Sequence, residues 1–135
     1  MSPPTSTVQP RVLIVEDLKD TRESLQEFLR LVLQENVDTA EDGTEALTML
    51  AEREYTLVIT DLRMPRINGM QLLREIRDRD YRCAVIITTG HVTVKEAVEA
   101  MKLGASDVLE KPVNPQHLAF VAEQVLRARA SVAAG

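Results

Sequence analysis

Short apolar runs alternate with segments of helical periodicity along this chain of 135 residues. The runs have the composition of strands buried on both faces, and they recur about every 20 to 27 residues. This alternation implies parallel strands joined by right-handed helical crossovers. We therefore predict a single α/β domain with helices on both faces of a doubly wound, five-stranded parallel sheet. The expected strands are 11–15, 37–40, 57–61, 84–87 and 108–109.

Helix start signals follow each predicted strand. The first helix is expected to begin at Asp20, with Glu23 completing a capping box, and to end at Asn36. The fourth helix is expected to end at Gly104, because glycine is common just beyond helix C-termini. The other helices are expected to begin at Asp42, Asn68, Thr93 and the pair Asn114-Pro115.

Composition indicates an ordinary globular domain at 11–128, between a disordered tail at 1–10 and a C-terminal tail or truncated linker at 129–135. The formal net charge of -5 argues against direct nucleic-acid binding, and we interpret the arginines in 74–82 as a solvated helix face. The single cysteine, Cys83, excludes an intrachain disulfide and is best interpreted as a small buried hydrophobe. The sequence has no secretory signal and no apolar run of membrane-spanning length, so we expect a cytoplasmic protein.

Polar side chains follow four of the predicted strands at the point where each strand ends. In isolation, Asp61 would be read as the start of a turn, and Glu16 with Asp17 as a helix cap. In a doubly wound sheet, however, all strand carboxyl ends lie on one edge, where open α/β sheets bind ligands. We therefore expect five side chains to converge there: Glu16, Asp17, Asp61, Thr89 and Lys111.

Three carboxylates on one edge repel each other, by roughly 4 kcal/mol for each unit pair at about 4 Å and an effective dielectric of about 20. Such a cluster needs a proton, a cationic side chain or a metal ion. Oxygen ligands without His or Cys suit Mg²⁺. Lys111 supplies a positive charge and Thr89 a hydroxyl donor. These are the parts needed to stabilise a phosphoryl group during its transfer to Asp61.

Four segments in order resemble the receiver domain of two-component response regulators. They are the Glu16-Asp17 pair, DLRMPRINGM from Asp61, TTGH at 88–91 and GASDVLEKP at 104–112. The resemblance covers roughly residues 11–128. It implies the flavodoxin-like strand order 2-1-3-4-5.

The resemblance also implies roles for individual residues. Asp61 would be the phosphoacceptor, Thr89 would hydrogen-bond the phosphoryl group and Lys111 would pair with it. Mg²⁺ would be held by Glu16, Asp17, Asp61 and the backbone carbonyl of Arg63. His91 and Arg63 would tune the lifetime of the phosphoryl group. Met64, Pro65 and Gly69 would shape the loop beneath the site, and Pro112 would follow a cis Lys111-Pro112 bond.

One position departs from the family pattern. Receivers usually carry Tyr or Phe three positions before the lysine, and Val108 occupies that position here. The Thr89 half of the usual Thr/aromatic switch is present and the aromatic half is missing. We therefore expect the relay to differ, while the chemistry at Asp61 is unaffected.

Several functional alternatives are open at this point. We predict a phosphoacceptor, not an enzyme acting on an external substrate, that supports its own phosphorylation and dephosphorylation. Its expected partners are a histidine kinase or phosphotransfer protein and a second copy, bound through the fourth helix, fifth strand and last helix.

The alternative is a receiver-fold interaction module that works without phosphorylation. A flavin binder is disfavoured because the first strand lacks a Gly- or Ser/Thr-rich loop. An aspartate-nucleophile phosphatase is disfavoured because Arg63, not Asp, lies two residues after Asp61. A stand-alone regulator and a receiver cut from a longer DNA-binding or ATPase protein both remain possible.

Overall fold

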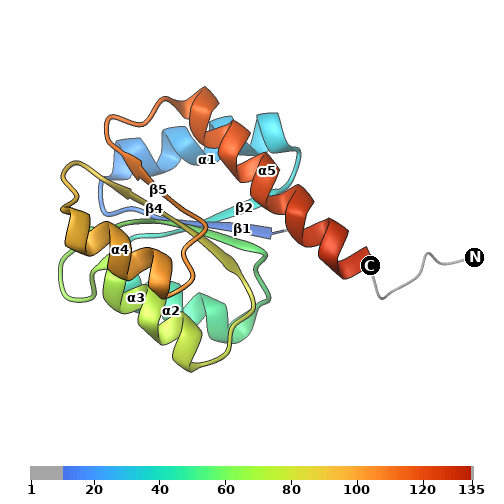
Figure 1. Ribbon diagram of the computed structural model, residues 1–135. Coiled ribbons are helices and arrows are strands. Elements are labelled where there is room, and N and C mark those ends of the chain that lie inside the picture. The colour runs from blue at the N-terminus through green and yellow to red at the C-terminus, as the bar shows by residue number, and fades with distance from the viewer. Residues whose placement is uncertain (1–10, 135) are drawn as a thin grey trace, which may run out of the picture.

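The computed structural model describes residues 11–134, with side chains described through residue 130, and contains five strands and five helices in strict alternation (Figure 1). The strands are β1 Arg11–Val15, β2 Asn36–Ala40, β3 Leu57–Asp61, β4 Ala84–Thr89 and β5 Asp107–Glu110. The helices are α1 Lys19–Leu33, α2 Gly43–Glu52, α3 Gly69–Asp78, α4 Val94–Lys102 and α5 Pro115–Ala134.

The strands form one parallel sheet in the order β2-β1-β3-β4-β5, which confirms the predicted fold class and strand order. The change of direction falls between β1 and β3, which pair in the centre of the sheet with Val15 opposite Thr60. Doubly wound sheets bind ligands beside such a switch point, at the strand carboxyl ends. The residues that follow β1 and β3 therefore lie where a ligand is expected.

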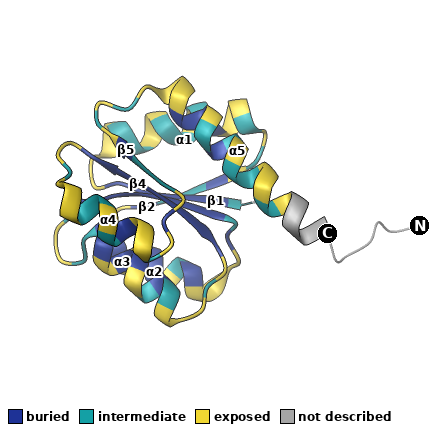
Figure 2. Cartoon of the chain, in the orientation of Figure 1, coloured by how far each residue is buried: buried dark blue, intermediate teal, exposed yellow. Residues whose placement is uncertain are grey.

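Helices cover both faces of the sheet, with α1 and α5 on one face and α2, α3 and α4 on the other (Figure 1). Alternate residues of each central strand point to opposite faces, so Leu13 and Val58 pack beneath α2 and α3 while Ile14 and Ile59 pack beneath α1 and α5. Both faces are thus apolar cores, and the central strands appear as continuous buried ribbons (Figure 2). Cys83 lies buried in the first of these cores, as predicted.

Most helix start signals act as predicted. Asn68 with Gln71, and Thr93 with Glu96, form complete capping boxes on α3 and α4, and the Asp42 side chain accepts a hydrogen bond from the Glu45 amide at the start of α2. At the start of α5, the Asn114 carboxamide oxygen accepts from the Gln116 and His117 amides. Gly104, with φ of 87°, lies just past the end of α4 in the left-handed conformation that favours glycine.

The predicted bounds of α1 are wrong at both ends. Leu18 precedes the helix and provides no side-chain cap. Asp20 lies inside the first turn, where its negative charge interacts favourably with the helix dipole. The helix ends at Leu33, and Gln34 caps it in a left-handed conformation with φ of 54°. Asn36 is the first residue of β2, opposite Arg11, and does not close the helix.

Helix α5 continues to Ala134, through most of the segment suggested as a C-terminal tail or linker. The predicted N-terminal tail, 1–10, and Gly135 lie outside the described residues. Within 11–134, the helices are all too short or too polar to cross a bilayer.

We expect Leu118→Ala to lower the free energy of unfolding by about 2–5 kcal/mol, because it leaves a cavity beneath α5. Leu118 is 0% exposed, whereas Phe120 on the same helix is 61% exposed. Phe120→Ala is therefore the matched control, with a change within about 0.5 kcal/mol. Urea unfolding of both variants checks the assignment, and equal losses would contradict the packing described for α5.

Candidate functional site

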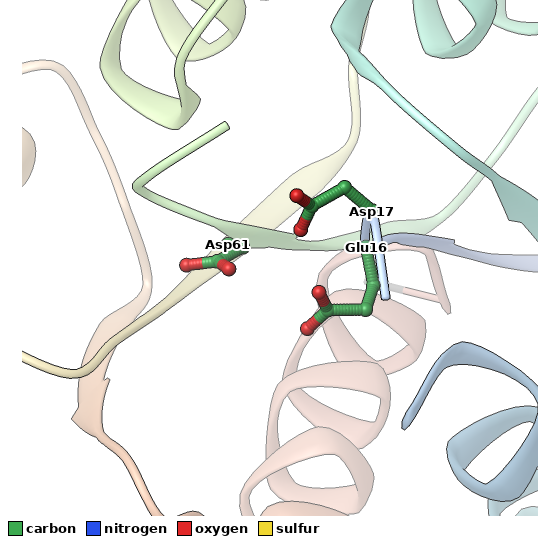
Figure 3. A group of neighbouring side chains, drawn as sticks. All are labelled: Glu16, Asp17 and Asp61. Atoms are coloured by element: carbon green, nitrogen blue, oxygen red, sulfur yellow. The ribbon is translucent and has the colours of Figure 1, made fainter. Parts of the chain in front are cut away.

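Three carboxylates meet where β1 and β3 end. Ligand oxygens of Glu16, Asp17 and Asp61 lie within 4.8 Å of one another, although Asp61 is far from the other two in sequence. The pairing of β1 with β3 brings them together, because Glu16 follows β1 directly and Asp61 is the last residue of β3. Figure 3 shows their carboxylate groups around a common space at this edge. The predicted acidic cluster is therefore present.

Lys111 neutralises part of this charge from the end of β5. Its Nζ lies 2.9 Å from Glu16 Oε1 and 2.9 Å from Asp61 Oδ2. Burial acts to lower the pKa of Lys111, but the hydrogen bonds and charges of Asp61 and Glu16 outweigh it, so the pKa is raised. The lysine therefore stays charged at neutral pH. Any stability that it contributes persists below its ordinary pKa and is lost only as the pH rises through the raised value.

The second oxygens of the two buried carboxylates accept backbone hydrogen bonds. Glu16 Oε2 accepts from the Leu18 amide at 3.1 Å, and Asp61 Oδ1 accepts from the Arg63 amide at 3.2 Å. Asp17 is exposed beside them. Mg²⁺ prefers a few carboxylate oxygens completed by water, and an exposed acid beside two fixed ones matches that preference. These three residues fit a magnesium ion. Lys111 contacts two of them, Glu16 and Asp61.

The loop after Asp61 leaves no room for a side chain at residue 69. A Cβ on Gly69 would lie 2.5 Å from the Asp61 carbonyl oxygen and 2.9 Å from the Leu62 Cα. The Gly69 amide donates to the Leu62 carbonyl at 2.9 Å, which closes the loop tightly. Met64 is partly buried against the α2–α3 core, while Pro65 is exposed. The predicted loop residues therefore lie directly after the acidic edge, and Gly69 has a clear steric reason to be glycine.

Thr89 lies at the predicted edge but is engaged locally. It is the last residue of β4 and is fully buried. Its hydroxyl donates to the His91 carbonyl at 2.9 Å and accepts from the His91 amide at 3.3 Å. The neighbouring Thr88 is the residue opposite Asp61 across the β3–β4 pair. The structure therefore places Thr89 one residue beyond Asp61's partner, with its hydroxyl directed to its own loop.

Two further predicted features lie on β5 and just after it. Val108 is half-buried opposite Ile87 and packs against the α2–α3 core. The Lys111-Pro112 bond is cis, as the resemblance implied. His117, in the first turn of α5, is exposed.

An ion pair near the site was not predicted. Arg63 reaches across to helix α4, where its guanidinium lies 2.8 Å from Glu96 Oε1 and donates to the His91 carbonyl at 3.2 Å. The hydrogen bond from Arg63, followed by one from the Thr93 backbone, lowers the pKa of Glu96. The sequence marked Glu96 only as a member of a predicted capping box, and a capping box indicates no partner outside its own helix.

A second unpredicted contact fixes the loop that carries the two N-terminal acids. Arg22, on α1, donates to the Glu16 carbonyl at 3.0 Å. Its guanidinium also lies 3.9 Å from Glu41, just after β2. The backbone that presents Glu16 is therefore tied to α1 as well as to the sheet.

The comparisons with known proteins agree with this geometry. The family model described as the response regulator receiver domain matches residues 12–123. The chain belongs to this family. It is thus a receiver of the kind found in two-component signal transduction, as the sequence motifs predicted.

Individual relatives support the same assignment. The chain is 41% identical to the transcriptional regulatory protein FixJ of Azorhizobium caulinodans over 69% of the chain, and 43% identical to the response regulator protein FleR of Pseudomonas aeruginosa over 80%. The match spans 46% of that FixJ and 23% of FleR, so this receiver corresponds to only part of each curated relative.

Solved receiver structures share its fold. A response regulator receiver domain protein from Clostridium thermocellum has a TM-score of 0.83 and 33% identity, over 91% of this chain and 98% of that one. A response regulator receiver protein from Pseudomonas putida has a TM-score of 0.81 and 34% identity, over 87% and 98% of the two chains.

We expect Asp17→Asn to weaken Mg²⁺ binding at least about tenfold, because it removes one negative charge from the cluster. Asp20→Asn is the matched control, since Asp20 is exposed on α1 and outside the cluster. Isothermal titration calorimetry with Mg²⁺ measures both affinities. Equal affinities would show that Asp17 does not hold the ion.

Proposed function

We propose that Asp61 accepts a phosphoryl group from a phosphohistidine of a histidine kinase or phosphotransfer protein, and that this modification switches a partner-binding surface. The observation that carries the proposal is the contact of Lys111 with both Asp61 and Glu16, beside the exposed Asp17. A buried aspartate at a strand end, with a cation and further acids around it, is suited to bind and transfer a phosphoryl group.

In the proposed reaction, a carboxylate oxygen of Asp61 attacks the donor phosphorus. A new P–O bond forms as the N–P bond breaks, and the donor imidazole leaves with the electron pair of that bond. The product is an acyl phosphate, an established form of covalent chemistry on aspartate. Bound Mg²⁺ would supply charge neutralisation at the phosphoryl oxygens.

The side chains around Asp61 then have distinct proposed roles. Lys111 Nζ, already 2.9 Å from Asp61 Oδ2, would pair with the negative charge that arrives with the phosphoryl group. Glu16, Asp17, Asp61 and the Arg63 carbonyl would hold the ion. Thr89 would exchange its hydrogen bond to the His91 carbonyl for one to the phosphoryl group. Arg63 and His91 would set how long that group survives.

The proposed output surface is the face formed by α4, β5 and α5, to which a partner or a second copy of the chain would bind. On α4 this face exposes Val94, Val98 and Met101. Phosphorylation would act by shifting the population of two conformations that differ in affinity for that partner.

We expect wild-type protein to gain the mass of one phosphoryl group after incubation with Mg²⁺ and acetyl phosphate, and Asp61→Asn to gain none. The amide oxygen is a poor nucleophile, so substitution removes the acceptor while nearly preserving its shape. Intact-mass spectrometry measures the gain, and Asp20→Asn should behave as wild type. Omission of Mg²⁺ should abolish the gain.

Phosphate gain on Asp61→Asn equal to that of wild type would show that another residue is the acceptor. No gain in wild-type protein that binds Mg²⁺ would call for a kinase as donor. No gain from either donor would favour the alternative that follows.

The alternative is a receiver-fold interaction module that signals without phosphorylation, and Val108 is the observation that favours it. A half-buried valine packs at the β5 position where receivers usually carry an aromatic ring. Under this alternative, self-association or partner binding is the same with and without the phosphoryl mimic beryllofluoride. Under the main proposal, sedimentation of the two samples differs.

A further inference from the structure

Helix α4 is held to the domain by little apolar packing. Of its residues 94–102, Ala100 alone is fully buried, whereas α3 buries five residues over a similar length. Its larger apolar side chains face solvent: Val94 is 82% exposed, Val98 47% and Met101 52%. Because buried apolar area is the main attractive term in folding, α4 is stabilised less by this term than α3 is.

Arginines from outside the helix supply polar contacts along it. Within the described residues, Arg63 pairs with Glu96 at 2.8 Å in the first turn, and Arg74 pairs with Glu99 at 2.6 Å one turn further on. At the far end, Arg77 donates to two backbone carbonyls that follow α4, so it is not part of a merely solvated face. The position of α4 therefore depends on ion pairs and hydrogen bonds to the β3–α3 loop and α3.

Arg63 differs from the other two arginines because it also contacts the acceptor site. Its amide donates to Asp61 Oδ1 at 3.2 Å, while its guanidinium binds Glu96 and the His91 carbonyl. That same carbonyl accepts the Thr89 hydroxyl at 2.9 Å. One residue thus links the Asp61 carboxylate, the β4–α4 loop and the first turn of α4.

A phosphoryl group on Asp61 would compete with Glu96 for this guanidinium. The ion pair is solvent-accessible, with about half of the Arg63 side chain exposed, so it is weak and easily exchanged. Guanidinium pairs with phosphoryl oxygens are charge-assisted and frequently bidentate, and hence stronger than a single exposed carboxylate contact. Arg63 lies two residues from Asp61, and so the competing charge would arise close to its backbone.

We propose that Arg63 is a positioning residue that couples Asp61 to helix α4. It holds the first turn of α4 through Glu96 while Asp61 is unmodified, and it turns to the phosphoryl group once Asp61 is phosphorylated. The inference rests on the proposed function of Asp61. It gives this receiver a route from the site to α4 that uses no aromatic side chain at Val108.

Hydrogen exchange of the α4 peptides tests the coupling, with Mg²⁺ present and with or without beryllofluoride. Glu96→Gln removes the charge but keeps the capping box, since glutamine serves there as well as glutamate. Without beryllofluoride, we expect the first turn of α4 to exchange about two- to fivefold faster in Glu96→Gln than in wild type. This range corresponds to the loss of one exposed ion pair. Beryllofluoride should accelerate exchange in wild type and add little in this variant.

Glu99→Gln is the matched control, because it breaks an arginine pair on the same helix that does not reach Asp61. It should keep the wild-type response to beryllofluoride. Arg63→Gln should behave as Glu96→Gln, and Arg63→Lys should restore part of the response.

Two failures are distinguishable by running intact-mass phosphorylation on the same samples. If wild type and Glu96→Gln both gain phosphate and α4 responds equally to beryllofluoride in both, the coupling through Glu96 is wrong. If wild type gains no phosphate from either acetyl phosphate or a kinase, the proposed function of Asp61 is wrong and the coupling falls with it.

Discussion

The repulsion among three carboxylates at one edge of the sheet is the constraint on which the site depends. At about 4 Å and an effective dielectric of about 20, each like-charge pair costs roughly 4 kcal/mol. The Lys111 ammonium offsets part of this cost by binding Glu16 and Asp61 together. These groups come from the ends of three strands, so their geometry is only as fixed as the sheet. Two apolar cores supply that rigidity by burying both faces of the central strands.

Most of this arrangement was predictable, because the relevant signals are short in range and the topology does the rest. The alternation of buried runs with helical segments implies a parallel sheet, and a parallel sheet places every strand carboxyl end on one edge. The wrongly predicted helix bounds are those of α1. Asp20 and Glu23 have capping-box spacing, but Leu18 precedes the helix without a side-chain cap. Gln34 caps the helix by adopting a left-handed backbone, which glutamine does not signal in a sequence.

The unpredicted part of the site consists of long side chains that cross between elements. Arg63 and Glu96 are 33 residues apart, and Glu96 already had a sufficient local explanation as a capping residue. The reach of Arg22 to the Glu16 carbonyl is likewise set by how α1 packs on the sheet. A residue at the end of a strand lies at a known edge of the sheet, so its place follows from the strand topology. The direction of an arginine on a loop or helix depends on its tertiary neighbours, and no spacing rule encodes it.

The same contrast separates the parts of the domain that should be rigid from the part suited to move. Asp61 and Glu16 are buried, and each has one oxygen bound to backbone and the other to Lys111. Most residues of helix α4 are instead exposed or half-buried (Figure 2), and its larger apolar side chains, Val94, Val98 and Met101, face solvent. Elements with few buried apolar contacts open at low free energy, and segments that move in allosteric changes come from this class. Exposed ion pairs suit such a helix, since they position it but cost less to break than the contacts of a packed core.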